Sequence, residues 1–127
     1  MSAPALSDEP NPALKGHKNP WDEALPRPAE GMSSYLCIMP DAADSKRMSV
    51  RPQHLADAAV GHEKGWIIKA GAMFADDSKQ KMVGSWFLIR EETLEKAKKR
   101  LGGDIYATGG AFDLSKATYT PVAIAKH

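Results

Sequence analysis

The chain has 127 residues, of which 43% are hydrophobic and 26% are charged, a composition typical of one globular domain and too apolar for a fully disordered protein. Its 17 basic and 16 acidic side chains give a formal net charge of +1, so no overall field attracts a nucleic-acid backbone or an anionic membrane surface. Because the sequence shows no long apolar run, no signal-peptide pattern and only one cysteine, we expect a cytoplasmic protein with no nucleic-acid and no membrane partner.

The beginning of the chain is rich in proline. Six of the nine prolines fall within the first 28 residues, among Ser, Asn, Asp and Glu. Such a segment sustains neither a helix nor an interior strand, so residues 1–33 are predicted to form a flexible tail and residues 34–127 one domain. Trp21 is the main indication that part of the tail docks on the domain; the alternative is a lone aromatic residue in a mobile segment.

The first periodic segments predict a strand and a helix. Residues 35–39 form a short apolar run before Pro40, which suits a strand covered on both faces and containing a buried Cys37. Pro52 then opens a segment with apolar residues at helical spacing, and Gly65 stands where a helix commonly ends. We therefore predict a first helix between these two residues.

A hairpin and a second helix follow. Two apolar runs, 66–74 and 82–89, flank a polar turn and are predicted to pair. Residues 94–101 repeat apolar side chains at helical spacing, with acidic and basic residues four apart on the exposed face. Gly102 and Gly103 are predicted to end this helix.

The last apolar segment, residues 117–125, contains Pro121, which a strand tolerates at a sheet edge or a bulge. The predicted order is therefore β-α-β-β-α-β, the ferredoxin-like α+β arrangement of an antiparallel four-stranded sheet with both helices on one face. The other face would carry apolar residues such as Trp86 in contact with water. A second copy packed on that face would cover them, so we predict a homodimer.

Four short stretches of the sequence carry a family resemblance. They are the ten-residue run 46–55, KRMSVRPQHL, and the shorter stretches Ala70-Gly71, Gly84-Ser85 and Asp104-Ile105-Tyr106. Together they resemble the YCII-related protein family; the ten-residue run is the most specific match, and Asp104-Ile105-Tyr106 is most similar to fungal members. The resemblance covers roughly residues 34–126 and implies a dimeric α/β barrel with a His and an Asp in a pocket, roles that fall on His54 and Asp104. Ile105 replaces the proline that commonly follows the aspartate in bacterial members.

The His54 and Asp104 pair predicts proton transfer. If His54 occupies the first turn of its helix, the positive end of the helix dipole disfavours imidazolium and leaves a neutral ring that accepts a proton. A carboxylate at Asp104 would hold one ring N–H and stabilise the imidazolium once it forms. The alternative is structural: His54 pins the helix start, and Asp104 anchors the following loop.

Four further residues are predicted to bind substrate: Arg51, Ser85, Trp86 and Tyr106. Arg51 suits a substrate carboxylate or enolate, although a solvated arginine before a proline is equally compatible. The aromatic residues suit either an apolar pocket wall or plain core. No spacing of His, Asp or Glu resembles a metal site and no glycine-rich phosphate loop follows a strand, so we predict no metal and no cofactor.

The leading functional hypothesis is a cofactor-independent isomerase, lyase or cyclase acting on a small cyclic or aromatic oxygenated metabolite, such as a polyketide-pathway intermediate. The alternative is a noncatalytic small-molecule binder or accessory protein that uses the same pocket. An RNA-recognition domain shares the element order, but residues 81–89 lack its basic and aromatic signature.

Overall fold

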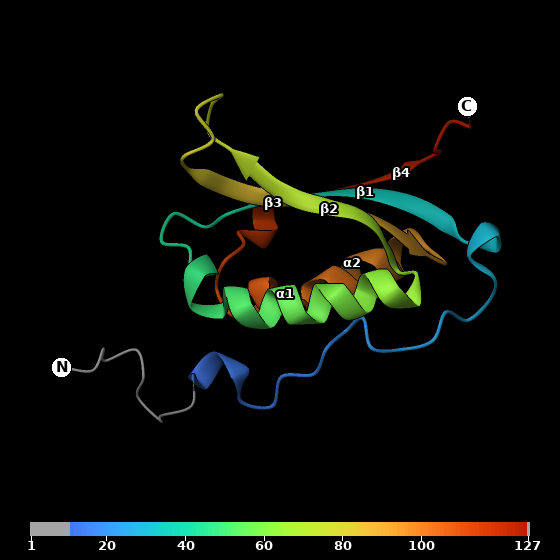
Figure 1. Cartoon of the computed structure of the whole chain (residues 1–127), viewed down its shortest axis with the longest axis horizontal. Coiled ribbons are helices and arrows are strands. Elements are labelled where there is room, and N and C mark those ends of the chain that lie inside the picture. Colours follow the sequence, from blue (N-terminus) through green and yellow to red (C-terminus); the bar gives the residue numbers. More distant parts are fainter. Residues whose placement is uncertain (1–10, 127) are drawn as a thin grey trace.

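The computed structural model describes residues 11–126, and these form one antiparallel four-stranded sheet with its helices on a single face (Figure 1). The strands pair in the order β2-β3-β1-β4, which confirms the predicted ferredoxin-like α+β fold. The main elements are β1 (Ser33–Pro40), α1 (Arg47–Lys64), β2 (Ile67–Phe74), β3 (Met82–Glu91), α2 (Leu94–Gly102), α3 (Ile105–Thr108) and β4 (Thr118–Val122). The described residues also form the 3-10 turns η2 (Pro12–Leu14), η3 (Ala29–Gly31) and η4 (Leu114–Lys116). Within residues 11–126, no helix has the length and apolar character needed to cross a bilayer.

The two faces of the sheet differ because side chains alternate along each strand. Cys37 of β1 lies opposite Phe87 of β3, and both are buried toward the helices. The neighbouring pair, Ile38 and Trp86, lies on the other face, and both are half-buried. The expectation that the first strand is covered on both faces is therefore wrong for the single chain, whereas the burial of Cys37 is confirmed.

Pro121 and Gly65 occupy the structural positions that the sequence predicts for them. Pro121 lies in β4, at an edge of the sheet, where a missing N–H costs no interior ladder bond. Gly65 ends α1 with a φ of 93°, a left-handed conformation that residues with a Cβ adopt only with strain.

Helix α1 begins earlier than predicted. It starts at Arg47, so Pro52 lies inside the helix and does not open it. This extra length buries Arg47 and moves His54 beyond the first helical turn. The argument that the helix dipole keeps His54 neutral is therefore wrong, because the dipole acts mainly within the terminal turns.

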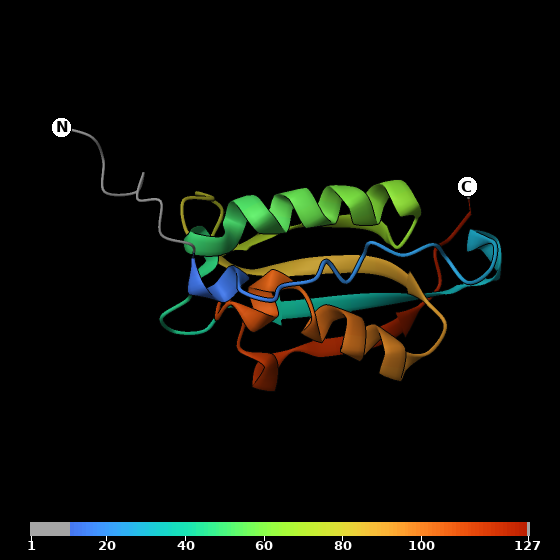
Figure 2. The ribbon, with the colours of Figure 1, turned by 90° about the horizontal axis from the view of Figure 1, so that it is seen from below.

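Residues 11–32, here called the strap, pass across the helix layer between α1 and α2 before entering β1 (Figure 2). Trp21 lies in the middle of the strap, has no exposed surface and belongs to the main hydrophobic core. The interpretation of Trp21 as an aromatic residue in a mobile tail is therefore corrected in favour of docking. The first ten residues of the predicted tail lie outside the described part of the chain.

Candidate functional site

The structure brings His54 and Asp104 together at the centre of the domain. The two atoms His54 Nδ1 and Asp104 Oδ1 are 3.0 Å apart, and the Asp104 side chain is fully buried. The same oxygen accepts the backbone N–H of Tyr106 at 2.9 Å, because Asp104 caps the start of α3. The other oxygen, Oδ2, accepts the indole N–H of Trp21 at 3.2 Å.

This bonding pattern favours one position for the ring proton. The indole N–H of Trp21 and the backbone N–H of Tyr106 both donate to the Asp104 carboxyl group, and a carboxylate only accepts hydrogen bonds. The 3.0 Å contact with His54 is therefore a hydrogen bond when Nδ1 carries the proton, which leaves the lone pair of a neutral ring on Nε2. Nε2 has no partner among residues 11–126, and no buried side-chain nitrogen or oxygen there lacks one, so Nε2 must reach solvent.

Aromatic neighbours hold the imidazole in place. The His54 ring stacks on the Tyr106 ring with centroids 3.7 Å apart and an angle of 11° between the planes. The Phe87 ring lies nearly perpendicular to the His54 ring, at an angle of 79° and with ring centroids 6.0 Å apart. Burial raises the pKa of the Tyr106 phenol, and the positive charges of Arg47 and Arg51 oppose this shift. The phenol therefore stays protonated at neutral pH.

A cavity of about 360 Å³ opens beside this pair, between α1 and the adjoining strands. Arg51, Ser85 and Tyr106 line it together with His54, so the structure gathers three of the four predicted binding residues around the predicted base. Arg51 forms no ion pair with any residue between 11 and 126 and is half-buried. Its guanidinium is thus available to a negatively charged oxygen.

Trp86, the fourth predicted binding residue, does not line the cavity. It lies on the face of the sheet that points away from the helices, because adjacent residues of a strand point to opposite faces. Phe87 occupies the cavity wall in its place.

Arg47 is a cavity residue that the sequence analysis missed. Its guanidinium binds both oxygens of Asp41 at 3.0 Å and donates to Ser85 Oγ at 2.8 Å. The guanidinium carbon also lies 4.6 Å from the centre of the Tyr106 ring. A helix that starts at residue 47 places residues 47, 51 and 54 on one face. The spacing of these three residues in the sequence could therefore have identified Arg47 as a cavity residue.

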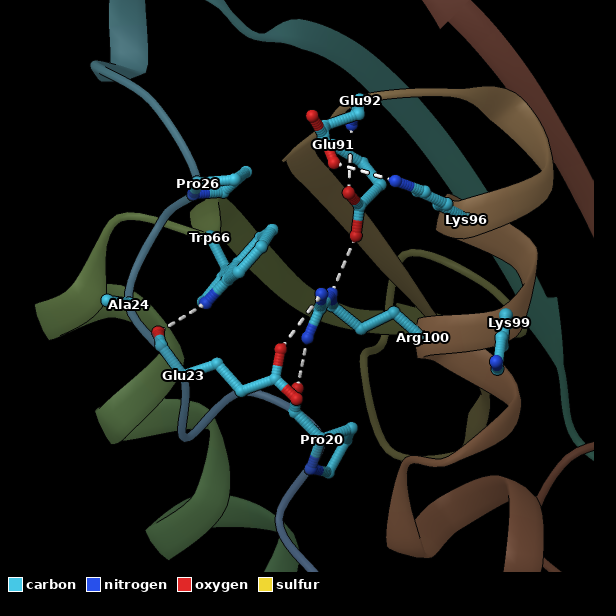
Figure 3. A pocket seen from close by; sticks show the side chains of 10 residues that line it. All are labelled: Pro20, Glu23, Ala24, Pro26, Trp66, Glu91, Glu92, Lys96, Lys99 and Arg100. Carbon is cyan, nitrogen blue, oxygen red and sulfur yellow. Dashed lines mark hydrogen bonds and ion pairs between the residues drawn. The ribbon is translucent and has the colours of Figure 1, made fainter.

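A second cavity, of about 410 Å³, lies where the strap meets α2 (Figure 3). Arg100 stands in it, bonded to Glu91 at 2.7 Å and to the carbonyl of Pro20, and stacked 3.6 Å from the Trp66 ring. Trp66 in turn donates to the Glu23 carbonyl at 2.8 Å. Arg100, Trp66 and their partners are engaged with one another and hold the strap against α2. Within residues 11–126, no three His, Cys, Asp or Glu side chains are grouped to hold a metal ion.

Comparisons with known proteins agree with this fold. No family model matches the chain. The chain is 36% identical over 85 residues to Protein YciI of Escherichia coli and equally to that of Shigella flexneri, covering 62% of this chain and 87% of each relative. A solved structure of 5-chloro-2-hydroxyhydroquinone dehydrochlorinase from Burkholderia phenoliruptrix, in complex with 2,5-dihydroxybenzoquinone, is 19% identical. It superposes with a TM-score of 0.56 over 74% of this chain and 94% of that one, a likeness of fold.

Proposed function

This chain belongs to the YciI family, and we propose that it is a cofactor-independent isomerase, lyase or cyclase acting on a small cyclic or aromatic oxygenated metabolite of polyketide type. The observation that carries this proposal is the buried His54–Asp104 pair, whose Nε2 has no partner in the described part of the chain and reaches solvent beside a cavity. The Asp104-Ile105-Tyr106 sequence further supports a fungal-type member.

The proposed chemistry begins with proton removal by His54. Nε2 takes a proton either from a carbon beside a carbonyl, whose electron pair moves toward the carbonyl oxygen to give an enolate, or from a phenolic hydroxyl, whose oxygen keeps the electron pair as a phenolate. Asp104 stabilises the resulting imidazolium through the Nδ1–H bond. Return of the proton to another atom completes an isomerisation, and its delivery to a departing group completes an elimination.

Two neighbours of His54 suit the negative oxygen that this step creates. Arg51 supplies a guanidinium with no protein partner among the described residues. Ser85 Oγ accepts from Arg47, so its own O–H remains to donate to a ligand. A cavity of about 360 Å³ lies at the lower end of the range for small-molecule sites, which favours a one- or two-ring substrate.

The second candidate function is noncatalytic binding in the same cavity. Arg51 and Ser85 line this cavity, and their guanidinium and hydroxyl suit an anionic oxygen without any proton transfer. Turnover therefore has to be tested separately from binding.

The two compounds named with the dehydrochlorinase are suitable first probes. Calorimetry with 2,5-dihydroxybenzoquinone measures binding, and chloride release from 5-chloro-2-hydroxyhydroquinone measures elimination. We expect His54→Ala to keep probe affinity within a few-fold and to lose turnover by on the order of a hundredfold or more. His62→Ala is the matched control, since His62 lines the same cavity from α1 but is exposed. Probes that bind without any turnover, across these and related hydroxyquinones, would leave the binding function standing.

We also propose that the protein is a homodimer, with its partner on the helix-free face of the sheet. That face presents four neighbouring apolar side chains from β1 and β3, namely Leu36, Ile38, Trp86 and Leu88. A contiguous apolar patch of this kind is unusual on a monomer. Sedimentation at micromolar concentration tests the proposal: Ile38→Lys should yield a folded monomer, and a wild-type monomer would overturn it.

A further inference from the structure

The carboxylate of Asp104 is held partly by a residue from outside the ferredoxin-like unit. Trp21, in the strap, donates its indole N–H to Asp104 Oδ2 at 3.2 Å, across 83 positions of sequence. The His54 and Tyr106 donors both use the other oxygen, Oδ1. Trp21 is therefore the sole donor to Oδ2 among residues 11–126.

The indole itself has little freedom to move. It is fully buried and stacks on Phe87, with ring centroids 6.2 Å apart and an angle of 20° between the planes. The backbone of α1 also comes so close that a Cβ at Gly61 would lie 3.1 Å from the Trp21 Cβ. A rigid donor on one oxygen prevents rotation of the carboxylate about its Cβ–Cγ bond.

We propose that Trp21 is a positioning residue for the His54–Asp104 pair. By holding Oδ2, it keeps Oδ1 facing His54 Nδ1, which keeps the proton on Nδ1 and the lone pair on Nε2. The strap contributes no residue to the cavity. Trp21 therefore acts on the pair through Asp104 and does not contact a ligand in the cavity. The consequence for catalysis rests on the proposed function, whereas the effect on the ring proton does not.

The test separates positioning from simple anchoring of the strap. Trp21→Phe keeps an aromatic ring against Phe87 and removes the indole N–H together with part of the bicyclic ring. Trp66→Phe is the matched control, because it removes another indole N–H that holds the strap, at the Glu23 carbonyl and away from the pair. The readout is the 15N spectrum of the His54 ring at about pH 8, which shows which nitrogen carries the proton.

In the wild type we expect one set of ring signals, from the Nδ1–H form. The two ring forms exchange rapidly, so in Trp21→Phe the Nδ1 and Nε2 chemical shifts should move toward each other, by the amount that corresponds to about one tenth or more of the Nε2–H form, while Trp66→Phe leaves the spectrum unchanged. Unchanged His54 signals in folded Trp21→Phe protein, or equal changes in both variants, would overturn the proposal. If Trp21→Phe does not fold, the wild type still decides, since a mixture of ring forms there contradicts positioning. A shifted ring proton without turnover of any compound would leave the positioning role intact and remove the enzymatic function alone.

Discussion

Arg47 Nη2 donates a hydrogen bond to Ser85 Oγ over 2.8 Å and thereby turns a buried serine into a donor toward the cavity. One lone pair of the Ser85 oxygen is occupied, so its hydrogen is left for a ligand. The arginine is itself held by both oxygens of Asp41. The arginine thus serves the fold and the cavity together.

Arg47→Lys should therefore affect both. A lysine has one compact ammonium and cannot keep the two-pronged contact with Asp41 and the bond to Ser85 at once. We expect a loss of about 1–3 kcal/mol in the free energy of unfolding, measured by urea denaturation, and weaker binding of anionic probes. Arg27→Lys is the control, because Arg27 pairs with Glu92 at 2.8 Å on the exposed surface. Equal effects of the two substitutions would contradict the role given to the buried arginine.

His54 and Asp104 should behave as one unit in turnover. His54→Ala and Asp104→Asn should each lower kcat on the order of a hundredfold, and the double variant should lose little more than the worse single one. Independent, multiplying losses would indicate separate roles.

Stability should distinguish these two variants. Asp104 caps α3 and accepts three N–H donors, so Asp104→Asn should also lower the free energy of unfolding, by about 1–3 kcal/mol. His54→Ala should lower the free energy of unfolding by less than Asp104→Asn does, because the His54 ring borders the cavity. Thermal denaturation of both proteins measures the difference.

Removal of the strap should be strongly destabilising. A chain that begins at Gly31 lacks Trp21, and loss of a buried aromatic side chain costs about 3–5 kcal/mol. The melting temperature should fall by roughly 10 °C or more. Trp21→Ala in the full-length chain should reproduce most of this loss. A truncated protein that melts within a few degrees of the wild type would show that the strap is dispensable, as its proline content first suggests.

The thiol of Cys37 should be unreactive in the folded protein. Burial raises its pKa from 9.0 to about 12, and the thiolate is the reactive form. Below pH 9 the thiol is neutral in both the folded and the unfolded protein, and its contribution to stability is fully present. That contribution is lost as the pH rises from 9 to about 12, because the thiol ionises first in the unfolded protein. A thiol reagent at about pH 8 should label unfolded protein within minutes and native protein far more slowly. Rapid labelling of native protein would contradict the burial.

Local patterns in the sequence were sufficient for most of the fold. Helix α2 carries its apolar residues at helical spacing and ends at glycines, and β4 accepts Pro121 because it is an edge strand. The start of α1 was misplaced because a proline is common in the first turn of a helix, and the preceding residues have no apolar stripe to signal helix. Because of that error, Arg47 was not predicted as a residue of the site.

Tertiary contacts account for what the sequence could not predict. Trp21 lies in a proline-rich segment with no periodicity, and its burial depends on a space between α1, α2 and β3 that exists only in the folded domain. The sequence analysis also placed Trp86 at the pocket. Adjacent residues of a strand point to opposite faces, so the structure has Phe87 in the cavity wall and Trp86 on the other face. Asp104 was found from family resemblance, and its three donors became visible only in the structure.

The strap also has a consequence for synthesis of the chain on the ribosome. Trp21 emerges first, yet its hydrogen-bond acceptor is 83 positions downstream. At translation rates of about 5–20 residues per second, this tryptophan waits roughly 4–17 s for its partner. During that interval the nascent segment exposes a large indole without a binding site, which makes it a natural point of contact for a chaperone. The base and its carboxylate are likewise completed only after nearly the whole domain has been made, so fragments released early should have no function.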